Sequence, residues 1–507
     1  MIAIFHAPLL QLALPEVIVV CAALLMLAMD ILFLRTCRTR IRFAVAAAIA
    51  SAGCAGAILR LLLAPEQANF LNGTLVANPL THLVQIALLV LTILTLGISV
   101  DSTFTEHVGE FVLLLLIATV GMMFLVGSQD LLVIFISLEL LSLSLYILTA
   151  LDKRSARSSE AALKYFLFGG MSAAFLLFGF SLLYGFSHST SLAEIASAIH
   201  AFHLGGSHIH GSQLNPLLAI AIVTTVIGFG FKVAAAPFHF WAPDVYEGAP
   251  APSAAFIASG SKVASFFIFF QIMVVGFAGA EGSAAWSRIV PGWVPALAIV
   301  AALSMLLGNL VAIVQRSARR LLAYSAIAHA GYMLLAMVAH TQQSFAALLY
   351  YVATYALATL GAFGVVAVVE KQTGSDQLSN FDGLSRRAPV LSFCLFIFLL
   401  SLAGIPPLAG FFGKFYLFAS VLAASSSLGL LWLVVLAIAM SAVSLYYYLQ
   451  VLKRVYVASP AADVEKIQTP RLSQLVIVLL AGAVVLFGCA PHLLLRWILE
   501  AVRVAGL

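Results

Sequence analysis

The sequence predicts an all-α polytopic membrane protein with about 14 transmembrane helices. Apolar residues make up 63% of its 507 residues and charged residues 9%, whereas a typical soluble domain carries about 25% charged residues. So few polar residues cannot cover the surface of a soluble protein of this size, and disorder requires the opposite composition. The apolar runs are long and continuous, which is typical of spanning helices rather than of the alternating strands of a membrane β-barrel.

A bilayer core requires roughly 20 apolar residues per helix. The runs of this length predict fourteen spans, at residues 9–34, 41–64, 79–100, 109–126, 130–151, 160–185, 215–236, 253–278, 293–314, 319–339, 344–370, 388–424 in part, 428–455 and 471–497.

The basic residues support this alternation of spans and give it a direction. If the N-terminus lies outside, the inside loops hold seventeen of the 25 lysines and arginines: Arg35, Arg38, Arg40, Arg42, Lys153, Arg154, Arg157, Arg316, Arg319, Arg320, Lys371, Arg386, Arg387, Lys453, Arg454, Lys466 and Arg471. The outside then holds four: Arg60, Arg288, Arg496 and Arg503. This bias agrees with the positive-inside rule. We therefore expect both termini to face the outside, which for a bacterial inner membrane is the periplasm.

The longest predicted loop, residues 186–214, is outside and rich in Gly, Ser and His. It carries His188, His200, His203, His208 and His210, whose spacings allow metal ligation in principle. No cysteine or carboxylate cluster joins them, so we expect a polar loop and no metal site. The five cysteines form no CxxC pair and are expected to be small packing residues. Nucleic acid is not an expected partner, because no basic patch lies on a soluble surface.

Ionisable residues inside the predicted spans are the candidate functional residues. A charge at the bilayer centre costs about 2.5–3.5 kcal/mol, so such residues are rare and usually functional. The sequence places the following within spans: Glu139, Lys164, Lys232, Lys262, His329 and Lys414. Lys164 is one turn from a span end and could reach the headgroups, and a histidine in a helix often serves packing, although it also suits proton relay.

The buried lysines suggest proton transfer. Burial disfavours the charged ammonium group and a nearby carboxylate favours it. A lysine held between these influences can take up and release a proton, and Glu139 is the natural carboxylate partner. We expect a proton to enter near Lys262, to reach Lys232 and to leave through Lys414.

Helix-breaking residues accompany two of these lysines in matching places, 182 residues apart. The breakers near Lys232 are Gly228, Gly230 and Pro237, and those near Lys414 are Gly404, Pro406 and Pro407. Interrupted helices at corresponding positions indicate an inverted-repeat transporter. We therefore expect an N-terminal three-helix segment (1–108), a first antiporter-like five-helix repeat (109–278), a second, inverted one (293–455) and a C-terminal loop with the last helix (456–507).

Three motifs carry a resemblance to a known family: FGFKVAAAPFHFWAPDVYEGAPAPSAAFIASGSK (229–262), SLAGIPPLAGFFGKFY (401–416) and EAALKYFLFG (160–169). The chain resembles the antiporter-like membrane subunits of the proton-pumping NADH:quinone oxidoreductase, respiratory complex I, over its whole length. The resemblance implies that Glu139, Lys232, Lys262 and Lys414 form the proton path, with Lys164 and His329 as auxiliaries.

The resemblance also implies a division of labour. Electron transfer from NADH to quinone would take place in the other membrane and peripheral subunits, which are the expected partners and would hold the flavin and the iron–sulfur clusters. This chain would bind none of these cofactors. The sequence agrees, because it has no cysteine cluster and no Gly-rich phosphate loop after a strand.

Two alternatives remain open. A subunit of a multisubunit sodium/proton antiporter would share the fold and the buried charges. Only the particular residues of the 229–262 motif argue against it. A non-transporting membrane scaffold would tolerate apolar replacement of the four charges.

Overall fold

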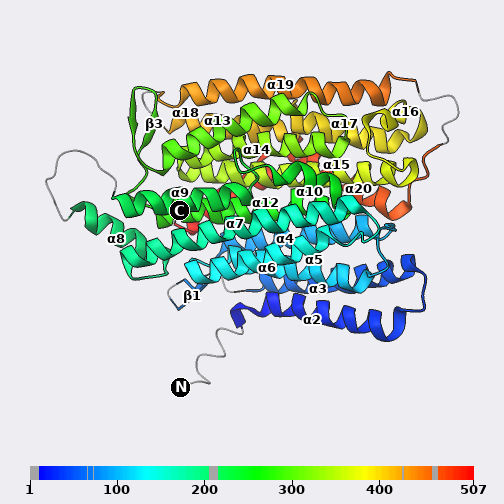
Figure 1. Ribbon diagram of the computed structural model, residues 1–507, viewed down its shortest axis with the longest axis horizontal. Helices are drawn as coiled ribbons and strands as arrows, with labels where there is room; N and C mark the ends of the chain where they lie inside the picture. Colours follow the sequence, from blue (N-terminus) through cyan, green and yellow to red (C-terminus); the bar gives the residue numbers. More distant parts are fainter. Residues whose placement is uncertain are drawn as a thin grey trace.

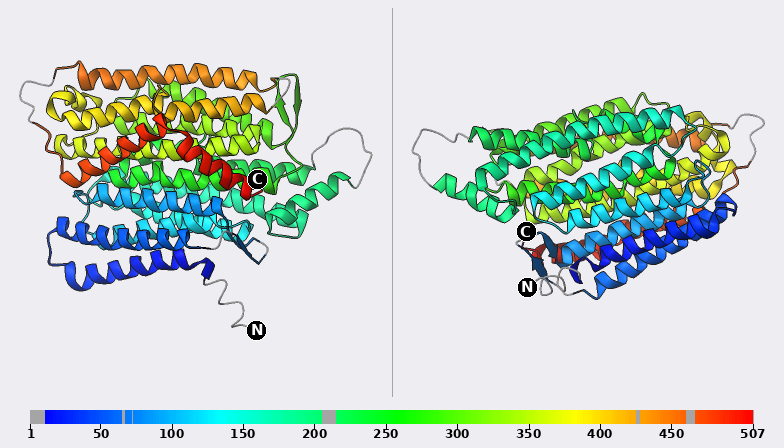
Figure 2. Two further views of the ribbon diagram at one scale, coloured as in Figure 1. Left: turned by 180° about the vertical axis from the view of Figure 1, so that it is seen from behind. Right: turned by 60° about the horizontal axis from the view of Figure 1, so that its bottom comes forward.

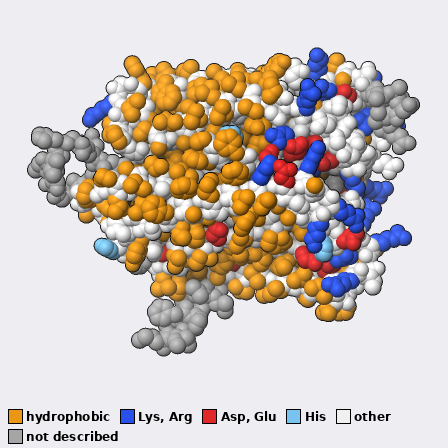
Figure 3. All heavy atoms as spheres, viewed as in Figure 1, with side chains coloured by type: hydrophobic (Ala, Val, Ile, Leu, Met, Phe, Trp, Pro, Cys, Tyr) orange, Lys and Arg blue, Asp and Glu red, His pale blue; other side chains and the backbone are white. Residues whose placement is uncertain are grey.

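The computed structural model describes residues 11–64, 67–71, 73–204, 215–424, 428–459 and 466–506. The helices lie side by side in one bundle, with the N-terminal pair along one edge and α19 along the other (Figures 1 and 2). Lysine and arginine side chains gather at one end of the bundle, and the rest of the visible face is mostly apolar (Figure 3). We call this end of the bundle the basic end. We call the opposite end the hairpin end, because both short β-hairpins lie at it.

The helices of the first half and their connections are α2 (Leu14–Met29) with its continuation η1 (Asp30–Leu34), α3 (Thr39–Leu62), the hairpin β1 (Ala68–Phe70) and β2 (Leu75–Ala77), α4 (Pro79–Ser99), α5 (Val108–Val126), α6 (Leu131–Thr149), α7 (Ala156–Ser187), α8 (Leu192–Leu204), α9 (Pro216–Lys232), α10 (Trp241–Gly248), α11 (Ala251–Ala258), α12 (Gly260–Gln271) and η2 (Ile272–Gly276).

The second half contains the hairpin β3 (Ser283–Ala285) and β4 (Arg288–Val290), α13 (Trp293–Ala312), α14 (Ala318–Ala339), α15 (Gln342–Thr373), η3 (Leu378–Phe381), α16 (Leu384–Arg387), α17 (Pro389–Ala403), α18 (Ala409–Ala423), α19 (Leu431–Tyr456), α20 (Arg471–Cys489) and α21 (His492–Val504).

The predicted spans appear as helices. Within the described residues, twelve continuous helical segments are long and apolar enough to cross a membrane. The other two spans are the interrupted ones, α9–α10 and α17–α18, whose pieces are shorter. The deepest core surrounds α12, α14 and α15, where most side chains are buried. Lys262, His329 and Lys414 are therefore surrounded by protein, whereas the side chains of Glu139 and Lys164 are 27% and 38% exposed.

Three details differ from the sequence-based expectation. The predicted loop 186–214 contains the helix α8, because Leu192, Ile195 and Ile199 form one apolar face and are fully buried. The last predicted span, 471–497, is two helices, because α20 ends at Cys489 and α21 begins after Pro491. The span 253–278 is kinked at Ser259, between α11 and α12.

A further difference concerns Gly228 and Gly230, which were expected to break a helix and do not. The helix α9 continues through both to Lys232. A β-carbon at Gly228 would lie 2.8 Å from Cβ of Leu176, and one at Gly230 would lie 2.6 Å from the Phe238 ring. These glycines allow close packing, and the break follows them at residues 233–240, which include Pro237.

The second interruption, between α17 and α18, contains the glycine and the two prolines that the sequence predicted as helix breakers. Gly404 ends α17 with a φ of 88°, which favours glycine, and Pro406 and Pro407 lie in the short connection before α18.

Candidate functional site

Glu139 and Lys232 form a pair in the first interrupted region. Glu139 lies in the middle of α6 and Lys232 is the last residue of α9. The Lys232 Nζ atom lies 3.9 Å from Oε1 of Glu139 and donates a hydrogen bond to Oγ of Ser142 at 2.5 Å. Since 3.9 Å exceeds hydrogen-bond length, the carboxylate acts on the ammonium group through space while Ser142 holds it.

Two backbone groups at the end of α9 and in the connection after it bond to side chains. Trp241 donates its ring N–H to the carbonyl oxygen of Phe231 at 3.0 Å, and the amide of Ala236 donates to Oγ of Ser304 at 2.8 Å. A broken helix at membrane depth requires such partners. These contacts fix the position at which α9 ends, and with it the position of Lys232.

Lys262 lies on α12 and is 1% exposed. Its Nζ atom donates to the carbonyl oxygen of Ala326 on α14 at 2.6 Å and lies 5.5 Å from the ring centre of Tyr355. No Asp or Glu in the described part of the chain lies within ion-pair distance of it. Its partners are therefore a neutral carbonyl group and an aromatic ring.

Lys414 has a similar environment in the second interrupted region. Because α17 ends at Ala403, its last carbonyl groups lack helical partners. The Lys414 Nζ atom donates to the oxygens of Leu402 and Ala403 at 3.1 and 3.0 Å and to Oγ of Ser441 at 2.8 Å. The helix break thus supplies the acceptors that a buried ammonium group requires.

His329 lies between Lys262 and Lys414 and is almost fully buried. Its Nδ1 atom is 2.7 Å from the Tyr351 hydroxyl, and its Nε2 atom is 3.3 Å from the Tyr448 hydroxyl. Its ring centre lies 5.0 Å from that of Tyr355, which contacts Lys262.

On the other side, the His329 ring lies 5.7 Å from the ring of Tyr332, over which Lys414 is placed at 5.1 Å. Contacts therefore run without interruption from Lys262 through Tyr355, His329 and Tyr332 to Lys414. Within the described residues, no comparable hydrogen bond or ring contact joins Lys232 to Lys262.

The tyrosines are the part of the site that sequence reasoning missed. They come from α14, α15 and α19, and their signal is visible as YYVATY at 350–355 and YYY at 446–448. In apolar helices such residues are more often packing residues, and only the structure shows that the hydroxyl groups of Tyr351 and Tyr448 lie against His329.

Lys164 lies apart from the other lysines. It is 38% exposed at the basic end, and its Nζ atom lies 2.7 Å from both Asp244 and Glu160. Asp244 also pairs with Arg320 at 2.8 Å.

Asp244 accepts hydrogen bonds from both Lys164 and Arg320, at 2.7 and 2.8 Å. Lys164 therefore belongs to a charge cluster that the sequence did not predict, because Asp244 and Arg320 are distant from it in the chain.

The histidines of the predicted loop are dispersed in the part that the structure describes. His188 ends α7, and His200 is an exposed residue of α8. His208 and His210, like the side chain of His203, lie outside the described residues. Among the described residues, no group of three or more His, Cys, Asp and Glu side chains could hold a metal ion.

The chain is similar in sequence to a known family and to individual members of it. Residues 128–441 match the family described as NADH:quinone oxidoreductase/Mrp antiporter, TM. NADH-quinone oxidoreductase subunit N 2 of Acidobacterium capsulatum is 54% identical over 503 residues, which cover 97% of this chain and 99% of the relative.

Two solved structures have folds similar to that of this chain. A chain of respiratory complex I from Thermus thermophilus is 33% identical, with a TM-score of 0.76 over 95% of this chain and 98% of that one. A chain of the Mrp complex from Dietzia sp. has a TM-score of 0.79 over 97% of both chains, but only 19% identity, so it supports the fold alone.

Proposed function

The chain belongs to the subunit N family of NADH-quinone oxidoreductases, and we propose that protons cross the membrane along its buried lysines. It is a membrane-arm subunit of a proton-translocating complex driven by electron transfer from NADH to quinone. The relative with 54% identity is an NADH-quinone oxidoreductase subunit, which argues against the first alternative, a subunit of a multisubunit sodium/proton antiporter.

The environment of Lys262 and Lys414 is the observation that carries the proposal. Both are buried, and both donate only to carbonyl or hydroxyl oxygens. Such acceptors bind an ammonium group or a neutral amine, because either form can donate. Each lysine can therefore lose a proton without leaving an unpaired buried charge on its partner.

The contacts support one part of the proposed route, from Lys262 past His329 to Lys414. A proton enters near Lys262 and exchanges with Lys232, whose affinity for it depends on the charge of Glu139. It then crosses by way of His329 and the surrounding tyrosine hydroxyls to Lys414. The interval between Lys232 and Lys262 lacks a direct contact, so this step requires ordered water. Lys164 is an auxiliary residue at the basic end.

The larger arrangement follows from the same proposal. The two five-helix repeats, 109–278 and 293–455, each contribute one interrupted helix, and residues 1–108 and 456–507 flank them. The basic end faces the cytoplasm, so both termini are periplasmic in a bacterial inner membrane. The chain itself binds no flavin, iron–sulfur cluster or nicotinamide.

Apolar replacement of two lysines tests the proposal against a scaffold role. In the assembled complex, Lys262→Met and Lys414→Met should each abolish most proton pumping in membrane vesicles, because methionine fills the space but carries no proton. NADH oxidation with an artificial acceptor should persist. A scaffold would leave pumping intact, so normal pumping in both assembled variants would reject the relay.

A further inference from the structure

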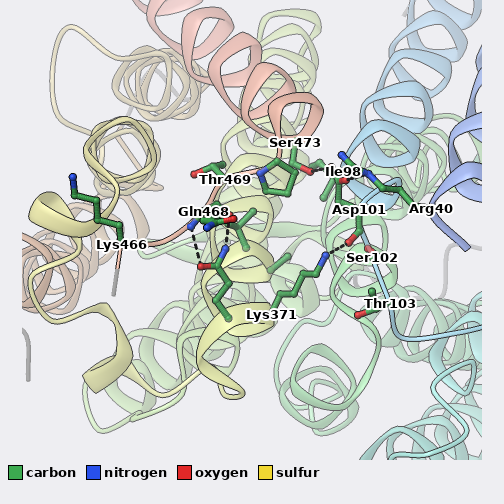
Figure 4. Close-up of a pocket in the computed structure, with 14 residues that line it drawn as sticks. Arg40, Ile98, Asp101, Ser102, Thr103, Lys371, Lys466, Gln468, Thr469 and Ser473 are labelled. Carbon is green, nitrogen blue, oxygen red and sulfur yellow. Dashed lines mark hydrogen bonds and ion pairs between the residues drawn. The ribbon is translucent and has the colours of Figure 1, made fainter. Parts of the chain in front are cut away.

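A cavity at the basic end lies outside the proposed proton path. It has a volume of about 620 Å³, within the range of roughly 300–1,000 Å³ that is usual for small-molecule sites. The ends of four membrane helices surround it: the first turns of α3 and α20 and the last turns of α4 and α15 (Figure 4). We call it the α3/α20 cavity. Its position at the ends of these helices corresponds to the headgroup layer of the bilayer.

Three cations from separate segments line the cavity: Arg40, Lys371 and Lys466. Its one carboxylate, Asp101, is already paired, because Arg40 Nε lies 3.1 Å from its Oδ1 atom and Ser473 donates to its Oδ2 atom at 3.1 Å. The side chain of Lys371 donates to the backbone oxygen of Asp101.

Lys371 and Lys466 have no ion-pair partner among the described residues. Lys371 is directed into the cavity, whereas Lys466 lies at the opposite rim with its amine pointing away from the other labelled residues (Figure 4). The cavity therefore holds one cation without an ion-pair partner in the part of the chain that the structure describes, and a second lies at its rim.

The segment that closes one side is held in place. Gln372 donates to the carbonyl oxygen of Gln468, and the amide of Gln468 donates to Oε1 of Gln372 at 3.0 Å. The cavity is thus shaped by packed helix ends and by a pinned segment.

Apolar groups adjoin the polar ones. Ile98, Val368 and Pro470 line the cavity itself. Ile41 and Leu472, the neighbours in sequence of Arg40 and Ser473, are 50% and 40% exposed, and Leu475 on the next turn of α20 is 55% exposed. A ligand with a negative headgroup and hydrocarbon chains can satisfy both surfaces at once.

We propose that the α3/α20 cavity binds the phosphate group of an anionic phospholipid, with the acyl chains lying along the exposed apolar side of α20. Basic cavities between membrane helices bind such headgroups. The proposal is independent of the proton path, and its readout is lipid occupancy.

Photolabelling of the purified complex tests the proposal. The probes are photoreactive phosphatidylglycerol and, as the neutral control, photoreactive phosphatidylcholine, and labelled peptides are mapped by mass spectrometry. Phosphatidylglycerol should label residues 39–43 and 471–479 in preference to phosphatidylcholine. Lys371→Gln should lower this labelling about fivefold, the effect expected for one surface cation.

Two variants control the experiment. Lys371→Arg keeps the charge and should keep the labelling. Lys453→Gln removes an exposed cation at the same end that does not line the cavity, and it should change nothing. Equal labelling by the two lipids, or unchanged labelling in assembled Lys371→Gln, would overturn the proposal. Loss of labelling in excess inorganic phosphate would show a soluble-anion site instead, and would overturn the assignment to lipid.

Discussion

Serine hydroxyls hold the two lysines at the helix breaks. Lys232 donates to Ser142 at 2.5 Å, and Lys414 donates to Ser441 at 2.8 Å. The lysines and breakers were visible in the sequence because ionisable residues and prolines are rare in apolar spans. The serines were not, since a serine in such a helix usually bonds its own backbone, as the Ser142 hydroxyl also does to Leu138.

Glu139 is the residue for which a change of charge alone should be informative. Glu139→Gln keeps the size of the side chain and removes the charge that favours protonation of Lys232. We expect proton pumping in vesicles to fall to a small fraction of wild type, whereas NADH oxidation with an artificial acceptor should persist.

Glu139→Asp is the matched variant for this experiment. It keeps the charge at a slightly greater distance from Lys232, so part of the pumping should remain. Wild-type pumping by an assembled Glu139→Gln complex would be incompatible with the proposed role of the carboxylate.

At the scale of elements, the end of α20 lies against the second helix break. A β-carbon at Gly488 would lie 2.1 Å from the carbonyl oxygen of Pro407. The Tyr350 hydroxyl donates to the oxygen of Phe487 at 2.7 Å. The last span is therefore interrupted where it meets the α17–α18 connection. The sequence alone did not predict this third interruption, because the apolar run continues past Pro491.

This contact predicts a large effect from one methyl group. Gly488→Ala should displace either α20 or the connection before α18, because no flexible side chain is present to yield. Overpacking of this kind costs about 1–3 kcal/mol, and displacement of the connection would also move the acceptors of Lys414. We expect a lower thermal stability of the purified complex and weaker pumping.

Gly482→Ala provides the control on the same helix. Nothing lies within 4 Å of a β-carbon at Gly482, so this change should be neutral or slightly stabilising, since alanine favours helix. If Gly488→Ala left stability and pumping as unchanged as Gly482→Ala, the close contact of α20 with the α17–α18 connection would be contradicted.

At the scale of the whole molecule, the number and order of the spans could be predicted from the sequence. Spans of about 20 apolar residues are required by the thickness of the bilayer, and each leaves a local signal. The convergence of Tyr351, Tyr355 and Tyr448 on His329 has no local signal, because it depends on how α14, α15 and α19 pack. For the same reason the pairing of Lys164 with Asp244 could not be predicted.

The proposed orientation, with the basic end toward the cytoplasm, predicts which end is accessible from which side. Ser197 on α8 and Ser459 after α19 are both exposed and lie at the hairpin end and near the basic end, respectively. With Cys21, Cys37 and Cys489 replaced by alanine, a membrane-impermeant thiol reagent should label Ser197→Cys in intact cells. It should label Ser459→Cys only in inverted membrane vesicles. The opposite pattern would reverse the topology.

The central claim is that the buried lysines take up and release protons, and arginine substitution tests it most directly. Arginine keeps the positive charge but does not release its proton in a protein, whereas alanine loses both the charge and the proton. A lysine that cycles must release its proton, so a fixed positive charge cannot replace it. The measurement is proton pumping in vesicles by Lys232→Arg and Lys414→Arg, beside the alanine variants and the amount of assembled complex. The account predicts that both arginine variants assemble and pump nearly as poorly as the alanine variants, and full pumping by both would contradict it.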